Sequence, residues 1–149
     1  MFWYFFVLIQ SSLAMIMLLH DWVHVPPLTD IKALKNNHPL WARVVTTVVN
    51  SMTVLVPLAI TLRFFGTEAM PLWAVRTIFW CYLGLTIGTI ASWWVPYIFG
   101  SSAAHKKGFA EYASTHRFLP ARGDNVVPNT LHVILHAHVW LCLFFAWVL

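Results

Sequence analysis

The sequence predicts an all-α membrane protein: four transmembrane helices in an antiparallel bundle, with both termini on the outer side of the membrane. Composition is the first observation, because 60% of the 149 residues are hydrophobic and only 9% are charged, against about 25% charged residues in an ordinary soluble domain. The second is the presence of four long apolar stretches, each near the roughly 20 residues that cross a bilayer core as a helix. The third is that the basic residues lie between these stretches or near their ends.

The four stretches predict helices at residues 3–22, 41–65, 72–99 and 131–149, in a single domain over residues 1–149. Helices are expected because a backbone in lipid must satisfy its hydrogen bonds within its own segment. In the third stretch Gly84 and Gly88 lie about one helical turn apart, and small residues at this spacing let membrane helices approach closely. We expect this stripe to pack within the bundle, with a homodimer through Gly84 and Gly88 as the alternative.

The charges of the loops predict the orientation. Loops 23–40 and 100–130 and their borders hold seven Lys and Arg residues, whereas the opposite side holds only Arg63 and Arg76. The seven are Lys32, Lys35, Arg43, Lys106, Lys107, Arg117 and Arg122. Because cytoplasmic loops are enriched in Lys and Arg, both loops are predicted to be cytoplasmic, in a multi-pass protein of the bacterial inner membrane. No basic face or motif accompanies the net charge of +4, so nucleic-acid binding is not predicted.

Capping residues predict further helix ends. Thr29 and Asp30 are placed to cap a short helix in the first loop, Ser101 and Ser102 to begin one in the second, and either Asn129 or Thr130 to cap the last transmembrane helix. The side chains of Asp, Ser and Asn accept a hydrogen bond from the free N–H groups of a first helical turn.

Four histidines form two pairs, His20 with His24 and His132 with His136. Residues four apart share a face of a helix, so each pair is expected to present two imidazoles together. If the first and last helices are antiparallel, both pairs lie near the cytoplasmic edge at matched depth, with Asp21 beside them. The sequence therefore predicts a histidine-rich polar site between the first and fourth helices.

Several chemistries fit this site. Neutral imidazole is a ligand for Zn, Cu, Fe or Ni, so the five residues above are candidate metal ligands, and His20 and His136 are candidate haem ligands. A polar cavity for a small ligand or for proton handling, or a structural hydrogen-bond network, is also compatible with the pattern. A non-enzymatic accessory subunit or scaffold of a larger membrane complex and a small oligomeric transporter are the alternative functions, and the sequence leaves open whether the protein is an enzyme.

The second loop contains another polar group, formed by His116, Arg117, Arg122 and Asp124. Its donors could hold an anion such as a phosphate headgroup and close the histidine site from the cytoplasmic side. The alternative is a solvated loop in which an arginine pairs with Asp124 or with Asp30.

Two segments resemble a known group of proteins. The stretches HDWVHVPPLTDIKALKNNHPL and THRFLPARGDNVVPNTLHVILH are similar to segments of small, uncharacterised bacterial four-helix integral membrane proteins. The resemblance implies one compact domain in the inner membrane, and it implies no activity or catalytic residue.

Overall fold

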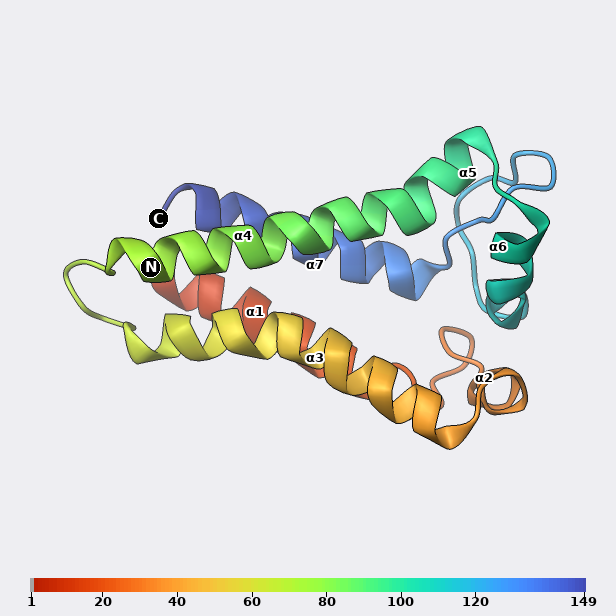
Figure 1. The fold of residues 1–149 in the computed structure, drawn as a ribbon, viewed down its shortest axis with the longest axis horizontal. Coiled ribbons are helices and arrows are strands. Elements are labelled where there is room, and N and C mark those ends of the chain that lie inside the picture. Colours follow the sequence, from red (N-terminus) through yellow and green to blue (C-terminus); the bar gives the residue numbers. More distant parts are fainter. Residues whose placement is uncertain (1) are drawn as a thin grey trace.

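A computed structural model describes residues 2–149, and within this range every regular element is a helix (Figure 1). Four segments are long and apolar enough to cross a membrane, as predicted: Phe2–Leu19, Leu40–Arg63, Leu72–Phe99 and Thr130–Trp147. The elements in chain order are α1 (Phe2–Leu19), α2 (Ile31–Asn37), α3 (Leu40–Arg63), α4 (Leu72–Thr89), η1 (Ile90–Trp94), α5 (Val95–Phe99), α6 (Ala103–Gly108), η2 (Ala110–Tyr112) and α7 (Thr130–Trp147).

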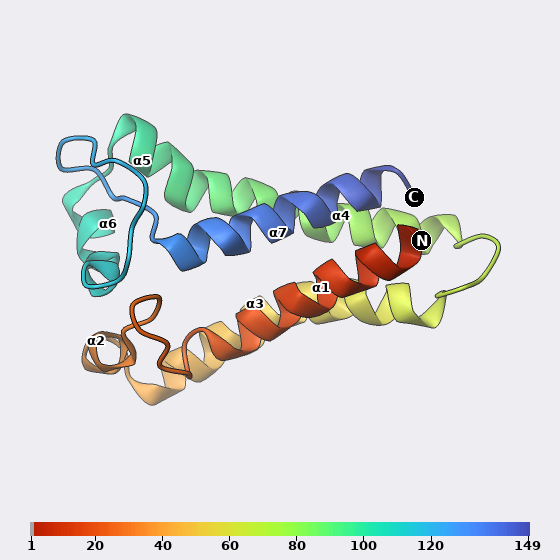
Figure 2. The same cartoon turned by 180° about the vertical axis from the view of Figure 1, so that it is seen from behind.

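The four long segments pack in a ring, in which α1 contacts α3 and α7, and α4 contacts the same two helices. The beginning of α1 lies beside the end of α7, because the rings of Phe2 and Phe6 have centroids 5.2 and 5.6 Å from that of Phe145. Both termini therefore lie at one end of the molecule, while α2 and α6 lie at the other (Figures 1 and 2). The distance between α3 and α4 increases from the end with the termini to the end with α2 and α6 (Figure 1).

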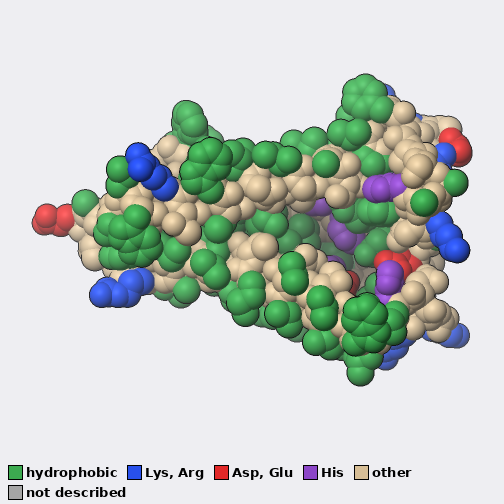
Figure 3. Space-filling model, in the orientation of Figure 1, with side chains coloured by type: hydrophobic (Ala, Val, Ile, Leu, Met, Phe, Trp, Pro, Cys, Tyr) green, Lys and Arg blue, Asp and Glu red, His purple; other side chains and the backbone are tan. Residues whose placement is uncertain are grey.

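The core of the ring is mainly apolar and contains a polar contact between two helices. Phe6, Leu13 and Val139 are fully buried, and Gln10 Nε2 of α1 donates a 3.0 Å hydrogen bond to Tyr82 Oη of α4. Many large apolar side chains of the same helices are exposed instead, including Leu8, Met15, Val48, Val49, Met52, Ile87 and Phe144. Figure 3 shows charged side chains gathered at the two ends and hydrophobic ones between them, which is the distribution that a lipid-facing surface requires.

The first helix ends at Leu19, three residues before the predicted end. At this end the Nδ1 of His20 lies 3.0 Å from the carbonyl oxygen of Ile16 and 3.2 Å from that of Met17. The Ile16 oxygen also accepts from the backbone N–H of His20, so the ring adds a side-chain partner to the last carbonyl groups of the helix. His24 consequently lies in the following loop, so the expectation that His20 and His24 share a helix face is wrong.

The third span contains a five-residue π-helix, η1, which the sequence analysis did not predict. Pro96 follows it and has no N–H to donate to the carbonyl oxygen of Ser92, its partner in a regular helix. His105 Nε2 lies 3.1 Å from that oxygen and replaces the missing donor. The span therefore changes its hydrogen-bond pattern next to the histidines of α7, and such π-segments are frequent at functional sites.

The predicted cap positions are confirmed, and the structure selects one residue of each candidate pair. Asp30 accepts a hydrogen bond from the N–H of Ala33 at the start of α2, and Ser102 accepts one from His105 at the start of α6. Asn129 accepts one from the N–H of His132 and so begins α7.

Replacing Tyr82 by phenylalanine (Y82F) should lower the free energy of unfolding by about 0.6 kcal/mol, the mean of interhelical hydrogen bonds measured in a membrane protein. The reason is that Gln10 Nε2 would lose its acceptor in the apolar core. Reversible unfolding in mixed micelles, followed by circular dichroism, measures this change. The control is Y4F, because Tyr4 is 70% exposed; equal stability of Y82F and wild type would contradict the role given to this bond.

Candidate functional site

A cavity of about 760 Å³ lies inside the ring, lined mainly by α3 and by α4 with η1. Figure 3 shows the molecule hollowed between these segments, with histidine side chains visible in the hollow. Its residues divide into two groups. The apolar or small ones include Met17, Ala42, Trp80, Cys81, Gly84, Leu85, Gly88 and Leu135, and the polar or ionisable ones include His20, Asp21, His38, Arg43, Asn50, Glu111, Tyr112, His132 and His136.

Glycines 84 and 88 face this cavity rather than another helix. A methyl group added at either position would meet no atom within 4 Å, and both residues line the cavity. The expectation that this stripe packs within the bundle is therefore wrong. Their missing side chains instead keep the space between α3 and α4 open.

His20 and Asp21 form one polar pair. His20 Nε2 lies 3.2 Å from Asp21 Oδ1, while Nδ1 faces the carbonyl oxygens at the end of α1. Both ring nitrogens of His20 thus face oxygen atoms of the chain.

His132 is oriented by Asn129. The Nδ2 of Asn129 donates to Thr115 Oγ1 at 2.9 Å, and Thr115 Oγ1 itself donates to the carbonyl oxygen of Tyr112. Asn129 Oδ1 must then be the acceptor 2.7 Å from His132 Nδ1. This network assigns the proton of neutral His132 to Nδ1 and leaves Nε2 as an acceptor.

His136 has the opposite tautomer. Trp94 Nε1 of η1 donates to His136 Nδ1 at 3.2 Å, so the proton of neutral His136 is on Nε2. The neighbouring Trp93 packs on His132, with ring centroids 4.1 Å apart. The π-helix thus lets two consecutive tryptophans contact the histidines of α7, which consecutive residues of a regular helix do poorly because they point about 100° apart.

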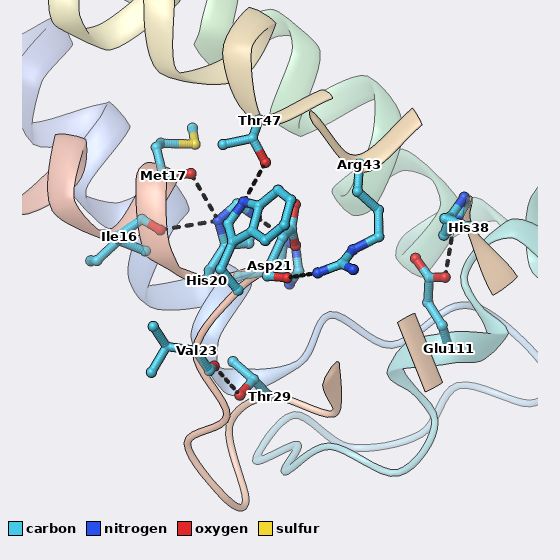
Figure 4. Close-up of polar contacts among 12 residues, drawn as sticks. Ile16, Met17, His20, Asp21, Val23, Thr29, His38, Arg43, Thr47 and Glu111 are labelled. Atoms are coloured by element: carbon cyan, nitrogen blue, oxygen red, sulfur yellow. Dashed lines mark hydrogen bonds and ion pairs between the residues drawn. The ribbon is translucent and has the colours of Figure 1, made fainter. Parts of the chain in front are cut away.

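Arg43 is the buried cation of the site, with 6% of its surface exposed. Its Nη2 donates a 2.6 Å hydrogen bond to the backbone oxygen of Asp21, and its guanidinium lies 4.5 Å from the centroid of the Trp22 ring. Trp22 is held in turn by a 2.8 Å bond from its Nε1 to Thr47 Oγ1. Figure 4 shows the Arg43 side chain directed at Asp21.

His38 and Glu111 form the second histidine–carboxylate pair, with Nε2 2.7 Å from Oε2 (Figure 4). The pair joins the end of α2 to η2 and so connects the two sides of the cavity at its loop end. Only 6% of the Glu111 side chain is exposed, and this burial raises the pKa of its carboxyl group, while the nearby His38 lowers it. Burial also raises the pKa of the neighbouring Tyr112 hydroxyl, so that side chain stays neutral.

The predicted site is assembled in part. His20, Asp21, His132 and His136 all line the cavity, whereas His24 is exposed and does not. The His20 and His132 rings are 6.0 Å apart, and those of His132 and His136 are 6.1 Å apart. Across residues 2–149, no group of three or more His, Cys, Asp or Glu side chains is arranged to hold a metal ion. The five-ligand set predicted from the sequence is therefore not formed.

The polar residues of the second loop do not line the large cavity. Asp124 pairs with Lys106 rather than with an arginine, and this contact lowers the pKa of its carboxyl group. Arg117 donates to the carbonyl oxygen of Tyr112, Arg122 lies over the ring of Tyr97, and His116 bonds to Thr130 Oγ1. Each of the four thus has a structural contact in or beside the loop.

Sequence reasoning missed three residues of the site: His38, Arg43 and Glu111. Arg43 was counted only as a loop charge, although it lies within the start of a predicted helix. Glu111 is one of two glutamates in the chain and lies in a loop with few other acids. This rarity was a signal in the sequence that Glu111 could belong to a site. Its contact with His38 joins residues 73 positions apart, which no local pattern encodes.

Comparisons with protein families, with curated proteins and with solved structures found no match to this chain. The functional argument therefore depends on the geometry of the site.

Replacing Asn129 by alanine (N129A) should lower the free energy of unfolding by about 1 kcal/mol or more, since N-cap removal alone costs about 0.5–2 kcal/mol and His132 Nδ1 also loses its acceptor. Chemical unfolding in micelles followed by circular dichroism tests this. The matched control is D30A, which removes the cap of the seven-residue α2 and should cost less. An equal loss of stability in both variants would contradict the double role of Asn129 as helix cap and as acceptor for His132 Nδ1.

Proposed function

We propose that this chain binds an amphiphilic small molecule, with the headgroup at the histidine–carboxylate end of the cavity and the apolar part between α3 and α4. One observation supports this most directly: a single cavity joins a cluster of ionisable side chains to apolar walls within the membrane-spanning segments. A purely polar ligand would not fill the apolar part, and a purely apolar ligand would leave the buried polar groups without partners.

The dimensions of the cavity suit a small amphiphilic molecule. The cavity volume of about 760 Å³ falls within the roughly 300–1,000 Å³ typical of small-molecule sites. Its lining on α4 and η1 runs from Trp80 to Trp93, which is roughly 20 Å of helix at about 1.5 Å per residue. This length accommodates an extended chain lying along the helix.

The proposal includes an orientation. The four spans would cross the bacterial inner membrane as an antiparallel bundle, with both termini outside and the polar end of the cavity at the cytoplasmic edge. The distribution of Lys and Arg supports this orientation. So do the aromatic contacts that bring the beginning of α1 to the end of α7. The ligand would then enter from the inner leaflet.

The contacts of the His20 ring favour an amphiphile over a metal or haem as the ligand. Both of its ring nitrogens face protein oxygens, so it has no free lone pair for a metal in this arrangement. His132 Nε2 remains an acceptor, and we assign it to a hydrogen-bond donor on the ligand.

Cys81 is a natural reporter for this proposal, because it lines the cavity while Cys142 is fully buried. A dodecyl amphiphile should slow the alkylation of Cys81 by N-ethylmaleimide at least tenfold, with the protein held in an amphipathic polymer free of detergent. Mass spectrometry resolves the two cysteines, and alkylation of Cys142 reports unfolding. The thiol of V48C, at a position 51% exposed on α3, serves as the unprotected control.

A cavity-filling variant sharpens the test. G88L adds a side chain where no atom lies within 4 Å of the new Cβ, so it should reduce the protection of Cys81 at least tenfold while leaving the fold intact. I87L, at a position 58% exposed on the adjacent residue, should behave as wild type. Equal protection of Cys81 and V48C, or unchanged protection in G88L, would refute binding in the cavity.

A further inference from the structure

We infer that the headgroup of the bound amphiphile is an anion, a phosphate or a carboxylate, and that Arg43 binds it. This inference rests on the proposed function, because it specifies the chemistry of the same cavity. The ligand class is thus an acidic single-chain amphiphile rather than a neutral or cationic one.

The first step is that Arg43 lacks a counter-charge. The ion pairs within residues 2–149 are His20–Asp21, His38–Glu111 and Lys106–Asp124, and none includes Arg43. Its side-chain hydrogen bond goes to a neutral backbone oxygen. A guanidinium is always charged in proteins, and burying such a charge without an opposite one is costly.

The second step is that Arg43 has an unused donor. Its Nε is buried and meets no acceptor in the described part of the chain, and the residue lines the cavity. A guanidinium binds carboxylate and phosphate through two parallel N–H bonds. Nη2 alone holds Asp21 O, so the guanidinium keeps N–H groups that have no partner in the described part of the chain.

The third step concerns the two carboxylates that also line the cavity, Asp21 and Glu111. Each would repel an anion if it were unpaired, but each contacts a histidine. Both carboxylates thus have an ionisable partner of their own, whereas Arg43 has none among the ion pairs of residues 2–149.

The remaining polar groups agree with an anion that has one proton to donate. Neutral His136 has its proton on Nε2 and offers a donor, whereas His132 Nε2 offers an acceptor. A phosphate monoester has oxygen acceptors for Arg43 and His136, and in its singly protonated form it has one hydroxyl for His132. A carboxylate would satisfy the donors only.

The test compares ligands that share a dodecyl chain and differ in headgroup: dodecyl phosphate, dodecanoate, dodecyl maltoside and dodecyltrimethylammonium. The readout is the concentration that halves the alkylation rate of Cys81, as above. The two acidic amphiphiles should do so at concentrations at least tenfold below those of the neutral and cationic ones. Inorganic phosphate, which has the charge without the chain, should require at least a hundredfold more than dodecyl phosphate.

Arg43 is tested by R43Q and R43K, with R63Q as the matched control near the other end of α3. R43Q should abolish the preference for acidic headgroups, R43K should keep most of it, and R63Q should keep all of it. If R43Q does not fold, the headgroup series on wild type still tests the anion. R43K then tests Arg43, because a lysine lacks the paired donors of a guanidinium and should raise the concentration of dodecyl phosphate that halves the alkylation rate, whereas an unchanged concentration would contradict the assignment.

The outcomes separate the two proposals. Equal protection by all four headgroups would overturn the anion and leave amphiphile binding standing. Protection by none of them would overturn both. Protection by inorganic phosphate as strong as by dodecyl phosphate would contradict the role of the chain, and an acidic preference that survives R43Q would overturn the assignment to Arg43.

Discussion

Polar groups buried at the end of a membrane bundle need partners, and in this protein most of the partners come from other elements of the chain. The carboxylate of Glu111 in η2 meets His38 at the end of α2, and Asn129 connects Thr115 of the second loop to His132. These contacts fix the loops on the helix ends and set the tautomers of the histidines. The cavity depends on them, because without satisfied loops its polar end would not keep a defined shape.

The space itself depends on small residues and on an irregular helix. Gly84 and Gly88 leave room between α3 and α4, and η1 turns Trp93 and Trp94 toward α7. In a soluble protein such a space would collapse or fill with water. In lipid, an acyl chain is as apolar as the walls, and the space then suits the chain of the amphiphile that we propose.

Much of the fold follows from the sequence, because hydropathy over 18 or more residues and cap residues such as Asn129 are local signals. The four spans were predicted correctly, and each of the three caps was predicted to within a pair of neighbouring residues. The pairing of His20 with His24 was wrong, since it assumed that the helix continues past Leu19, whereas α1 ends there and the His20 ring contacts the carbonyl groups of its last turn. Contacts such as His38–Glu111 join segments distant in sequence, and a single sequence contains no signal for them.

The central claim is that an amphiphile lies inside the ring with its chain between α3 and α4. The most direct measurement is photo-crosslinking with a fatty acid that bears a diazirine near the end of its chain, followed by mass spectrometry of the labelled residues. We expect labels on the cavity side, at Thr53, Cys81 and Leu85, and few on the outward face of the same helices, at Val49 and Ile87. Labels of equal density on both faces would contradict the claim.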